Sequence, residues 1–543
     1  MRSFTISLTM LATLVGGGSG QQKTAVPPQP QSSGGTYYVD CSASVNGDGS
    51  QSSPWNALSS PDAFTFSAGN QLLLKRGTTC QGTLSPLGSG SRGAPIVVDS
   101  YGVGAQPVID GGDNDEAVLL SNQQYWEIHN LEVVGGYQYG VLIWGDVPNS
   151  SLNHLHLVNL NVHGAHYIST FTGDSGEIYI NPVGMHEVVN DVLIDGVSTH
   201  DSHVAEGIWV EAGGDFNGQV AACEQQPTPE YDLGSNITIQ NSTAHNVYGD
   251  GILILAVNNG LMQNNVVYNT GLCPSCVRTP SGLWEWCCHS CTLQYNESYA
   301  NRTGGGLYDG GDFDIDIFNE HNILQYNYGH DTDGYCVQFL GYDYLTAPDK
   351  DNVFRYNVCS NNGRNRNITP QGDVLVDGYI DGMQVYNNTF YWNPAVNSAL
   401  FLTYAYPGTD TRIFKNNIIY SAVPDLIQTP SGYTLDNNIY WTISTSPPTW
   451  QWNGVTYTDF SAYQSGSGQD AHSYYTDPML NDPTYHGSPR PTTAFTLQAG
   501  SPARGTGANV CTGISGCSMG KHDFFGNRLP NGSGYDIGAD QAP

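Results

Sequence analysis

Basic side chains are scarce in this sequence. Its 543 residues include 17 Lys and Arg against 49 Asp and Glu, which gives a formal net charge of −32 at pH 7. Such a surface repels nucleic acids and anionic membranes, so neither is an expected partner. It also repels polyanionic glycans unless a cation intervenes. Charged residues of both signs make up only 12% of the chain while Gly reaches 65, and this balance favours short strands and tight turns over helices.

Long hydrophobic runs are missing after the first residues. No later stretch approaches the roughly 18 apolar residues that a membrane-spanning helix needs. Residues 1–20 combine a positive charge at Arg2, an apolar stretch to Val15 and small residues from Gly16 to Gly20, which is typical of a secretory signal. Residues 21–35 predict a flexible leader. We therefore expect a secreted, extracellular protein, monomeric by default because no oligomer signal is readable.

The twelve cysteines form an even set, which in a secreted chain predicts disulfides. We expect Cys41 and Cys80 to pin the N-terminal region and Cys511 and Cys517 to close a C-terminal loop. The spacing from Cys273 to Cys291 is similar to a zinc site, but an oxidising compartment favours a disulfide-laced loop. Glycosylation is expected at sequons that include Asn149, Asn236, Asn301, Asn367 and Asn531.

A short motif of alternating apolar residues followed by asparagine recurs along the chain. It ends at Asn130, Asn159, Asn241, Asn296, Asn327, Asn357, Asn387 and Asn416. Like residues lie above one another when parallel strands stack about 4.8 Å apart, and asparagine tolerates the left-handed turn that must follow. The repeat predicts an all-β fold, a single-stranded right-handed parallel β-helix solenoid whose stacked coils share one core. An antiparallel β-sandwich is the alternative, but it does not require this register.

Short motifs stand at both ends of the chain. Near the N-terminus they are Thr-Tyr-Tyr-Val-Asp at 36–40, Asn-Gly-Asp-Gly at 46–49, Lys-Arg-Gly at 75–77 and Pro-Val-Ile-Asp-Gly at 107–111, and near the C-terminus they are the segments 523–527 and 536–539. The first group resembles the N-terminal cap of secreted pectate-lyase-like β-helix proteins, and the second group is similar to their C-terminal closing segment. The resemblance implies an N-terminal cap and first coils over 36–120, coils over 121–445, and C-terminal loops and closure over 446–543. That superfamily holds polysaccharide lyases, epimerases and glycoside hydrolases, so the fold alone does not give the reaction.

Carboxylates recur where strands begin. Aligning the glycines that open successive strands places Glu206, Asp250 and Asp333 in one column, each just before its glycine. Glu285 and Asp309 then follow Gly282 and Gly306 by three residues. On this alignment the two carboxyls project in one direction from neighbouring coils, as the acid and the nucleophile or base of a glycosidase do. The catalytic candidates are Glu285, Asp309, Asp250 and Asp333, although acidic residues at turns commonly cap backbone N–H groups.

Aromatic residues flank these acids. Trp284, Trp286, Tyr308 and Tyr335 are candidates for stacking on sugar rings, with His330 and Glu206 as further substrate-binding candidates. Packing in the core or at the rim is the alternative for each aromatic. Motifs of the polygalacturonase type are absent, and Gly329-His330-Asp331 is only a partial echo of one of them.

Three functions remain open at this stage. The first is a glycoside hydrolase acting on a polysaccharide or its oligosaccharides, with no cofactor. The second is a polysaccharide lyase or uronate epimerase, for which Asp309, Asp312, Asp314 and Asp316 could hold Ca²⁺ through oxygen ligands; the shortage of basic residues counts against it. The third is a glycan-binding solenoid without catalysis. We assign no metal ligand from the sequence.

Overall fold

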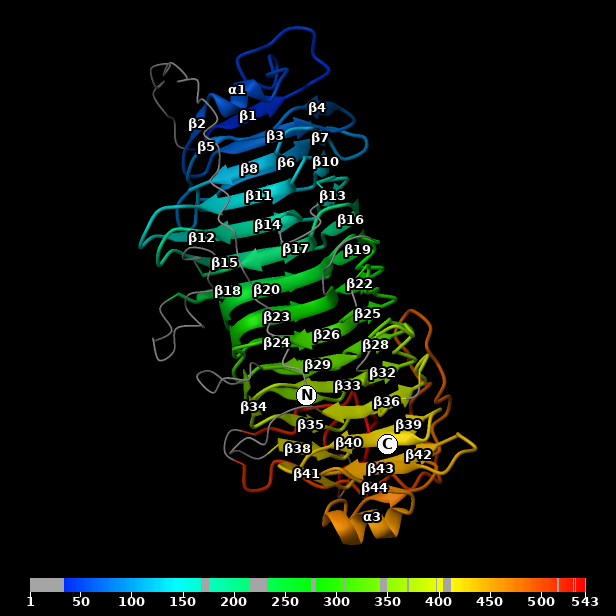
Figure 1. The fold of residues 1–543 in the computed structure, drawn as a ribbon. Helices are drawn as coiled ribbons and strands as arrows, with labels where there is room; N and C mark the ends of the chain where they lie inside the picture. Colours follow the sequence, from blue (N-terminus) through cyan, green and yellow to red (C-terminus); the bar gives the residue numbers. More distant parts are fainter. Residues whose placement is uncertain are drawn as a thin grey trace.

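Stacked parallel strands make up nearly the whole molecule, as the repeat predicts. The computed structural model describes residues 34–167, 175–213, 232–274, 280–305, 308–341, 349–368, 371–396, 398–403, 412–514, 517–530, 532 and 534–542. The predicted signal at 1–20 and almost all of the leader at 21–35 lie outside these residues. With the exception of β44, the strands of the coils pair in parallel from one coil to the next (Figure 1), so the fold is the expected parallel β-helix and not a sandwich.

The strands form three faces, which we name sheets A, B and C. Sheet A contains β8 (Glu116–Ser121), β11 (Tyr139–Gly145), β14 (Gly176–Pro182), β17 (Glu206–Glu211), β20 (Asp250–Asn258), β23 (Ser281–His289), β26 (Gly311–Ile315), β29 (Val337–Leu340), β33 (Val374–Asp377), β37 (Phe401–Thr403), β40 (Asp425–Thr429), β43 (Thr449–Trp452) and, antiparallel at its end, β44 (Val455–Tyr457). Sheet B contains β1 (Thr36–Val39), β3 (Gln71–Lys75), β6 (Ile96–Tyr101), β9 (Trp126–His129), β12 (Ser151–Val158), β15 (Val188–Asp195), β18 (Gly234–Gln240), β21 (Leu261–Gln263), β24 (Thr292–Gln294), β27 (Ile323–Gln325), β31 (Val353–Arg355), β35 (Gln384–Tyr386), β38 (Arg412–Lys415) and β41 (Tyr433–Asp436).

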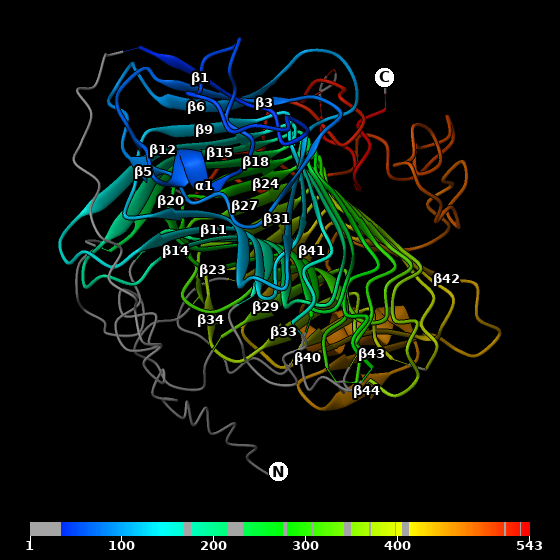
Figure 2. The ribbon, with the colours of Figure 1, turned by 90° about the horizontal axis from the view of Figure 1, so that it is seen from above.

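Sheet C has fourteen strands. They are β4 (Thr79–Gln81), β7 (Val108–Gly112), β10 (Glu132–Gly135), β13 (Asn161–His163), β16 (Ser198–Ser202), β19 (Thr243–Val247), β22 (Val266–Tyr268), β25 (Glu297–Tyr299), β28 (Tyr328–His330), β32 (Val358–Ser360), β36 (Thr389–Trp392), β39 (Ile418–Ser421), β42 (Ile439–Thr442) and β45 (Tyr474–Tyr475). Two short pairs, β2 (Thr65–Phe66) with β5 (Leu87–Gly88) and β30 (Asp349–Lys350) with β34 (Ile380–Asp381), stand beside them. Viewed from above, the coils of the three sheets lie over one another around a common interior (Figure 2).

Two helices are described, at opposite ends of the coil stack (Figure 1). They are α1 (Ser59–Asp62) and α3 (Phe460–Ser467). After α3 the chain runs back along the outside of the coils, where Arg490 donates to the carbonyl of Tyr326 and Gly538 to the carbonyl of Asn416. Among the residues that the structure describes, neither helix is long and apolar enough to cross a membrane.

The core is the column of inward side chains. On sheet A one inward row carries Ile208, Ile252, Leu283, Phe313 and Val337, each in register with the next and fully buried. Burying one such side chain contributes roughly 1.5–3 kcal/mol, so the stack of coils is stabilised mainly by this continuous interior.

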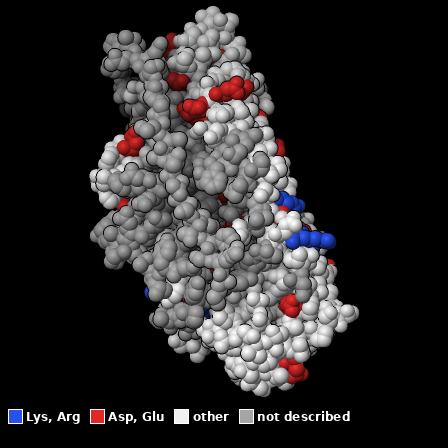
Figure 3. Space-filling view, in the orientation of Figure 1, with Lys and Arg blue, Asp and Glu red and all other residues white. Residues whose placement is uncertain are grey.

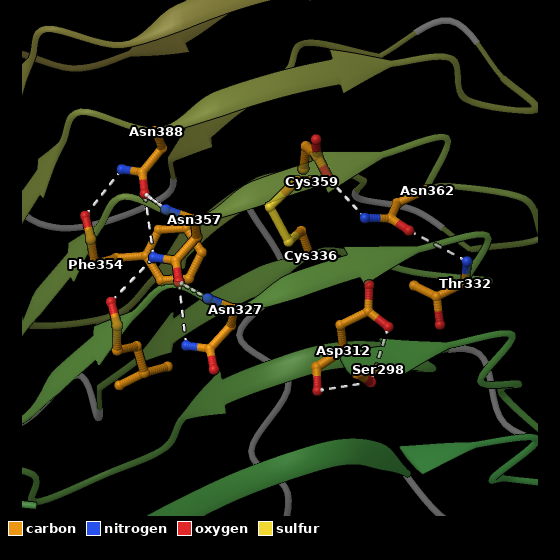
Figure 4. Close-up of a disulfide and its surroundings, with 12 residues drawn as sticks. Ser298, Asp312, Asn327, Thr332, Cys336, Phe354, Asn357, Cys359, Asn362 and Asn388 are labelled. Carbon is orange, nitrogen blue, oxygen red and sulfur yellow. Dashed lines mark hydrogen bonds between the residues drawn. A yellow bond between two sulfur atoms is a disulfide. The ribbon is translucent and has the colours of Figure 1, made fainter. Parts of the chain in front are cut away.

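Stacked asparagine amides line a second inward row (Figure 4). Asn265, Asn296, Asn327, Asn357, Asn388, Asn417 and Asn438 each accept a backbone N–H from the preceding coil or donate to a neighbouring carbonyl. The sequence repeat predicts a single column of asparagines, but the structure has two columns at neighbouring positions. The backbone is left-handed at the preceding position, which is occupied by Asn130, Asn159, Asn241, Asn387 and Asn416. The motif therefore merged two rows, because either position suits asparagine.

Removing one rung of this ladder is expected to destabilise the protein strongly. In Asn327→Ala the buried N–H of Asn296 and the carbonyl of Leu293, 3.0 and 2.9 Å from the Asn327 amide, lose their partners. At about 1–3 kcal/mol for each unsatisfied group, the free energy of unfolding falls by roughly 2–5 kcal/mol. Urea unfolding measures this, with Gln263→Ala on an outward row as the control, for which a change below about 1 kcal/mol is expected. Equal losses for the two variants would contradict the assignment.

Disulfides close both ends as predicted. Cys41 bonds to Cys80 and Cys511 to Cys517, while Cys336 bonds to Cys359 inside the coils. Cys273 and Cys287 are also disulfide-bonded. Cys288 and Cys291, however, are free thiols in the core, so the expectation that all twelve cysteines pair is wrong. Both thiols are buried in the interior, close to the carboxyl group of Glu285.

One predicted sequon falls in the core. Asn301 is fully buried, and its amide donates to Ser298 and Asp312. An enzyme that attaches a glycan needs an exposed amide, so this position is not a glycosylation site in the folded protein. Asn236 is exposed at the start of β18 and remains a candidate, whereas Asn531 lies outside the described residues.

Candidate active site

The outward face of sheet A carries a row of large and acidic side chains. Tyr179, Trp209, Leu253, Trp284, Asp314 and Gln338 follow one another in register from β14 to β29. Inward neighbours alternate with them, as strand geometry requires. The space-filling view shows Asp and Glu at several places on the described surface and Lys and Arg at only a few (Figure 3).

Asp314 lies at the centre of a hydrogen-bonded cluster around the hydroxyl of Tyr335. That hydroxyl is 2.9 Å from Oδ2 of Asp314, 3.2 Å from Oδ1 of Asp309 and 2.9 Å from Oγ of Ser281. The tyrosine ring spans the intervening coil because Gly311 has no side chain: a Cβ there would lie 2.1 Å from the ring. The distance between Oδ2 of Asp314 and Oδ1 of Asp309 therefore cannot exceed the sum of their two distances to the tyrosine hydroxyl.

The protons of this cluster are constrained. A tyrosine hydroxyl carries one proton and cannot donate to two carboxylates at once. Burial, followed by the nearby Asp316 and Asp309, raises the pKa of Asp314 well above its usual value. A protonated Asp314 donates to the tyrosine oxygen, which leaves the tyrosine proton for Asp309. The arrangement thus holds one carboxylic acid beside one carboxylate.

Asp316 and Asp309 flank Asp314 and are its two more accessible neighbours. Asp316 follows β26 on the same outward face and is partly exposed, and burial raises its pKa to about 6. Asp309 is also partly exposed, with a left-handed backbone (φ 57°) followed by Gly310 at φ 72°. Aspartate and glycine are the residues that tolerate this conformation, which turns the Asp309 carboxyl toward Tyr335.

The predicted pairing of Glu285 with Asp309 is wrong. Glu285 is in register with Ile254 and Ile315, points into the core and is fully buried. The next strand of sheet A after β23 is β26, which begins at Gly311 and not near Gly306. Burial raises the pKa of Glu285 to about 8, and neither of its oxygens makes a well-formed hydrogen bond within the described part of the chain.

The predicted column of Glu206, Asp250 and Asp333 is correct for the first two residues. Glu206 and Asp250 are in register, Glu206 accepts from the Asp250 N–H (3.2 Å), and Asp250 accepts from the Ser281 N–H (2.6 Å). Both acids therefore cap backbone groups next to the cluster. Asp333 lies apart, in the turn before β29, where it accepts from the Thr303 N–H and lies 3.4 Å from Arg302.

The predicted aromatic residues divide into three groups. Trp284 and Trp286 are partly exposed on the outward face of β23, and Tyr308, beside Asp309, is 49% exposed. Tyr335 is buried and holds the carboxylates, so it offers no stacking surface. His330 belongs to sheet C, is buried between Tyr299 and Tyr328, and bonds to Asp331 and Glu297. Its predicted place beside the acids is therefore wrong.

The four aspartates considered for Ca²⁺ do not share a site. Asp312 points inward, where Ser298 and Asn301 donate to its Oδ1 (Figure 4). The strand bends at this position, so Asp312 and Phe313 both face the core while Asp314 faces outward. Among the described residues, the sets of ligand atoms that converge within 4.8 Å do not include Asp309, Asp314 or Asp316.

From the sequence, Asp314 was noted only as one of several nearby aspartates, and neither Ser281 nor Trp209 was given a role in the site. The signal was present in the alternation of Asp312-Phe313-Asp314-Ile315-Asp316. A period of two places Asp314 and Asp316 on the face opposite to Ile315. Tyr335 was recognised, but only as an aromatic surface.

Tyr335→Phe is expected to lower kcat by about ten- to a hundredfold, because the carboxylates lose the hydroxyl that fixes their separation. The ring remains over Gly311, so the fold should be kept, although the melting temperature should fall because the buried Asp314 loses a hydrogen-bond partner. A pH profile of kcat measures the effect, and the acidic and basic limbs should shift because Asp314 loses its partner. An unchanged profile would show that the hydroxyl does not position the acids.

No protein-family model matches this chain, and no curated protein matches it by sequence. Among solved structures, a GH136 lacto-N-biosidase from Eubacterium ramulus superposes with a TM-score of 0.54 and 22% identity, over 75% of this chain and 68% of that one. A pectate lyase, Pel9A, matches over 94% and 97% of the two chains at 17% identity and a TM-score of 0.40. The first likeness establishes the shared β-helix fold, which is the fold that the repeat and the end segments predict.

Proposed function

We propose that this protein is a glycoside hydrolase that cleaves a polysaccharide or its oligosaccharides at the acidic cluster of sheet A. The observation that carries the proposal is the cluster itself: Asp309 and Asp314 both bond to one tyrosine hydroxyl, and Asp316 lies two residues beyond Asp314 and helps to raise its pKa. Partly exposed tryptophans lie beside them. Glycosidases use paired carboxyl groups, one kept protonated and one ionised. The structurally similar lacto-N-biosidase is named for cleaving a glycan, which agrees with this assignment.

The three aspartates take different roles in the proposed reaction. Asp316 is the general acid, since its pKa of about 6 keeps it protonated in mildly acidic medium and the residue is partly exposed. Asp309 is the nucleophile or base. Asp314 and Tyr335 position this pair, while Glu206 and Asp250 keep the adjoining strands in register.

Sugar rings are proposed to stack on Trp284, Trp286 and Tyr308. Trp284 is the register neighbour of Asp314, so a ring seated on it lies next to the acids. Aromatic faces bind the C–H faces of sugars without needing charge. This suits a neutral glycan, because the ionised carboxylate of the cluster repels a uronate.

A lyase or epimerase is less well supported. Such a reaction needs a base and a cation to neutralise the uronate, and the nearby Arg302 is engaged by Asp333. We also infer that the protein acts outside the cell, because disulfides such as Cys336–Cys359 persist in oxidising compartments.

The mass of products released from a panel of neutral and acidic glycans, with and without chelator, tests the proposal. Hydrolysis gives products that carry one added water and are unaffected by chelator. Unsaturated products that lack this water and are lost on chelation would replace the hydrolase with a cation-dependent lyase. Binding without any cleavage would support the glycan-binding alternative.

A further inference from the structure

A second cluster of chemically active side chains lies on sheet B, away from the acidic site. Glu127 on β9, His154 and His156 on β12 and Asp191 on β15 come from three successive coils. Glu127, His154 and His156 each offer a ligand atom, and these atoms lie within 4.8 Å of one another. We call the five residues Glu127, His129, His154, His156 and Asp191 the histidine cluster.

The backbone brings the two imidazoles together. His154 and Asp191 both adopt left-handed φ angles, 59° and 58°, at the point where β12 and β15 bend. Side chains two residues apart on a regular strand are separated by almost 7 Å. The bend instead leaves the rings of His154 and His156 with centroids 3.9 Å apart.

The hydrogen bonds of His154 orient it as a ligand. Its Nδ1 is 2.8 Å from Oδ2 of Asp191, and its Nε2 is 3.0 Å from Oε1 of Glu127. If the ring of His154 is neutral and its proton is on Nδ1, that proton points at Asp191. The lone pair of Nε2 then points at the carboxylate of Glu127. Two lone pairs at this distance repel unless a cation lies between them. A carboxylate that holds the far nitrogen of a metal-bound histidine is the usual outer partner in such sites.

The remaining atoms complete the donor set. Nε2 of His156 is buried without a hydrogen bond, with Oδ1 of Asp191 3.5 Å away. The second oxygen of Glu127 lies 3.3 Å from Nε2 of His129. Two imidazoles and a carboxylate are ligands that Zn²⁺ and similar divalent transition metals accept in tetrahedral geometry.

We propose that Glu127, His154 and His156 bind one divalent transition metal ion of the zinc type, with Asp191 positioning His154. The ion ties β9 to β12 directly and to β15 through Asp191. It therefore stabilises the N-terminal coils and takes no part in the reaction proposed for sheet A.

Metal titration of the chelator-treated protein tests this site. Zn²⁺ is followed by calorimetry and Co²⁺ by its visible spectrum, which is intense for tetrahedral sites. We expect one ion per chain, a loss of affinity of at least about a hundredfold in His156→Gln, and a loss of about ten- to a hundredfold in Asp191→Asn. His186→Gln, which alters a histidine paired with Asp232 elsewhere, should bind as the unaltered protein does.

The alternative is that His154 is a doubly protonated ion-pair partner of Glu127 and Asp191. In that case the unaltered protein binds no stoichiometric metal, or His156→Gln and Asp191→Asn bind it equally well, and either result overturns the proposal. Melting temperatures of the metal-free variants report folding. Zn²⁺ should raise the melting temperature of the unaltered protein and of His186→Gln but not of His156→Gln. If His156→Gln does not fold, Asp191→Asn gives the decision.

Discussion

Asp316→Asn and Asp309→Asn are each expected to lower kcat by about 10³-fold or more, with a much smaller change in KM. An amide can neither donate the proton of a general acid nor serve as nucleophile or base, and each role contributes roughly 10²–10⁴-fold. Residues that act as one unit are not additive, so the double variant should be little worse than either single variant. Initial rates on the glycan that the panel identifies measure these losses.

The pH dependence separates the two roles. Because burial raises the pKa of Asp316 to about 6, kcat of the unaltered enzyme should fall as the pH rises above that value and the acid loses its proton. Asp316→Asn should lack this limb. Asp333→Asn is the matched control, since its carboxyl bonds within a neighbouring turn, and it should keep activity within a few-fold. A loss in Asp333→Asn as large as in Asp316→Asn would place the chemistry elsewhere.

Glu285→Gln is expected to leave activity within a few-fold and to change the pH dependence of stability instead. The folded protein keeps the Glu285 proton up to about pH 8, whereas the unfolded chain loses it near the ordinary value of 4.5. Between these two values the folded state binds more protons, so the free energy of unfolding falls as the pH rises. The share from this residue reaches at most about 5 kcal/mol, at about 1.4 kcal/mol for each pKa unit.

Urea midpoints at about pH 5 and about pH 8 measure this effect. The unaltered protein should be clearly less stable at the higher pH, and Glu285→Gln should lose part of that difference. Burial also raises the pKa of Glu177 to about 8 and that of Asp373 to about 7, and both lower the stability at high pH in the same way. The remaining difference in stability between the two pH values therefore persists in Glu285→Gln. If Glu285→Gln loses activity while the pH dependence of its stability is unchanged, Glu285 belongs to the active site.

The fold was predictable because its signals are repeated and local. Alternating apolar residues ending in asparagine mark each coil. The same signal therefore occurs many times along the sequence. The error of one residue between Asn130 and Asn296 did no harm, since both rows suit asparagine and both belong to the same turn. The disulfides at the two ends followed from cysteines close in sequence.

The site was harder to predict because one misplaced residue reverses the face of a strand. Trp284-Glu285-Trp286 cannot project on one face, so placing the tryptophans outside already places Glu285 inside. The alignment through Gly306 hid this, because β26 begins only at Gly311. Contacts such as that of Tyr335 with Asp309 and Asp314 join separate coils, and no local pattern encodes them.

A crystal structure of the Asp309→Asn variant with the glycan identified by the panel tests whether sheet A is the site of cleavage. We expect a sugar ring on Trp284 with its glycosidic oxygen within hydrogen-bond distance of Asp316. A saccharide bound to sheet B or sheet C, or on sheet A beyond reach of Asp316, would contradict it.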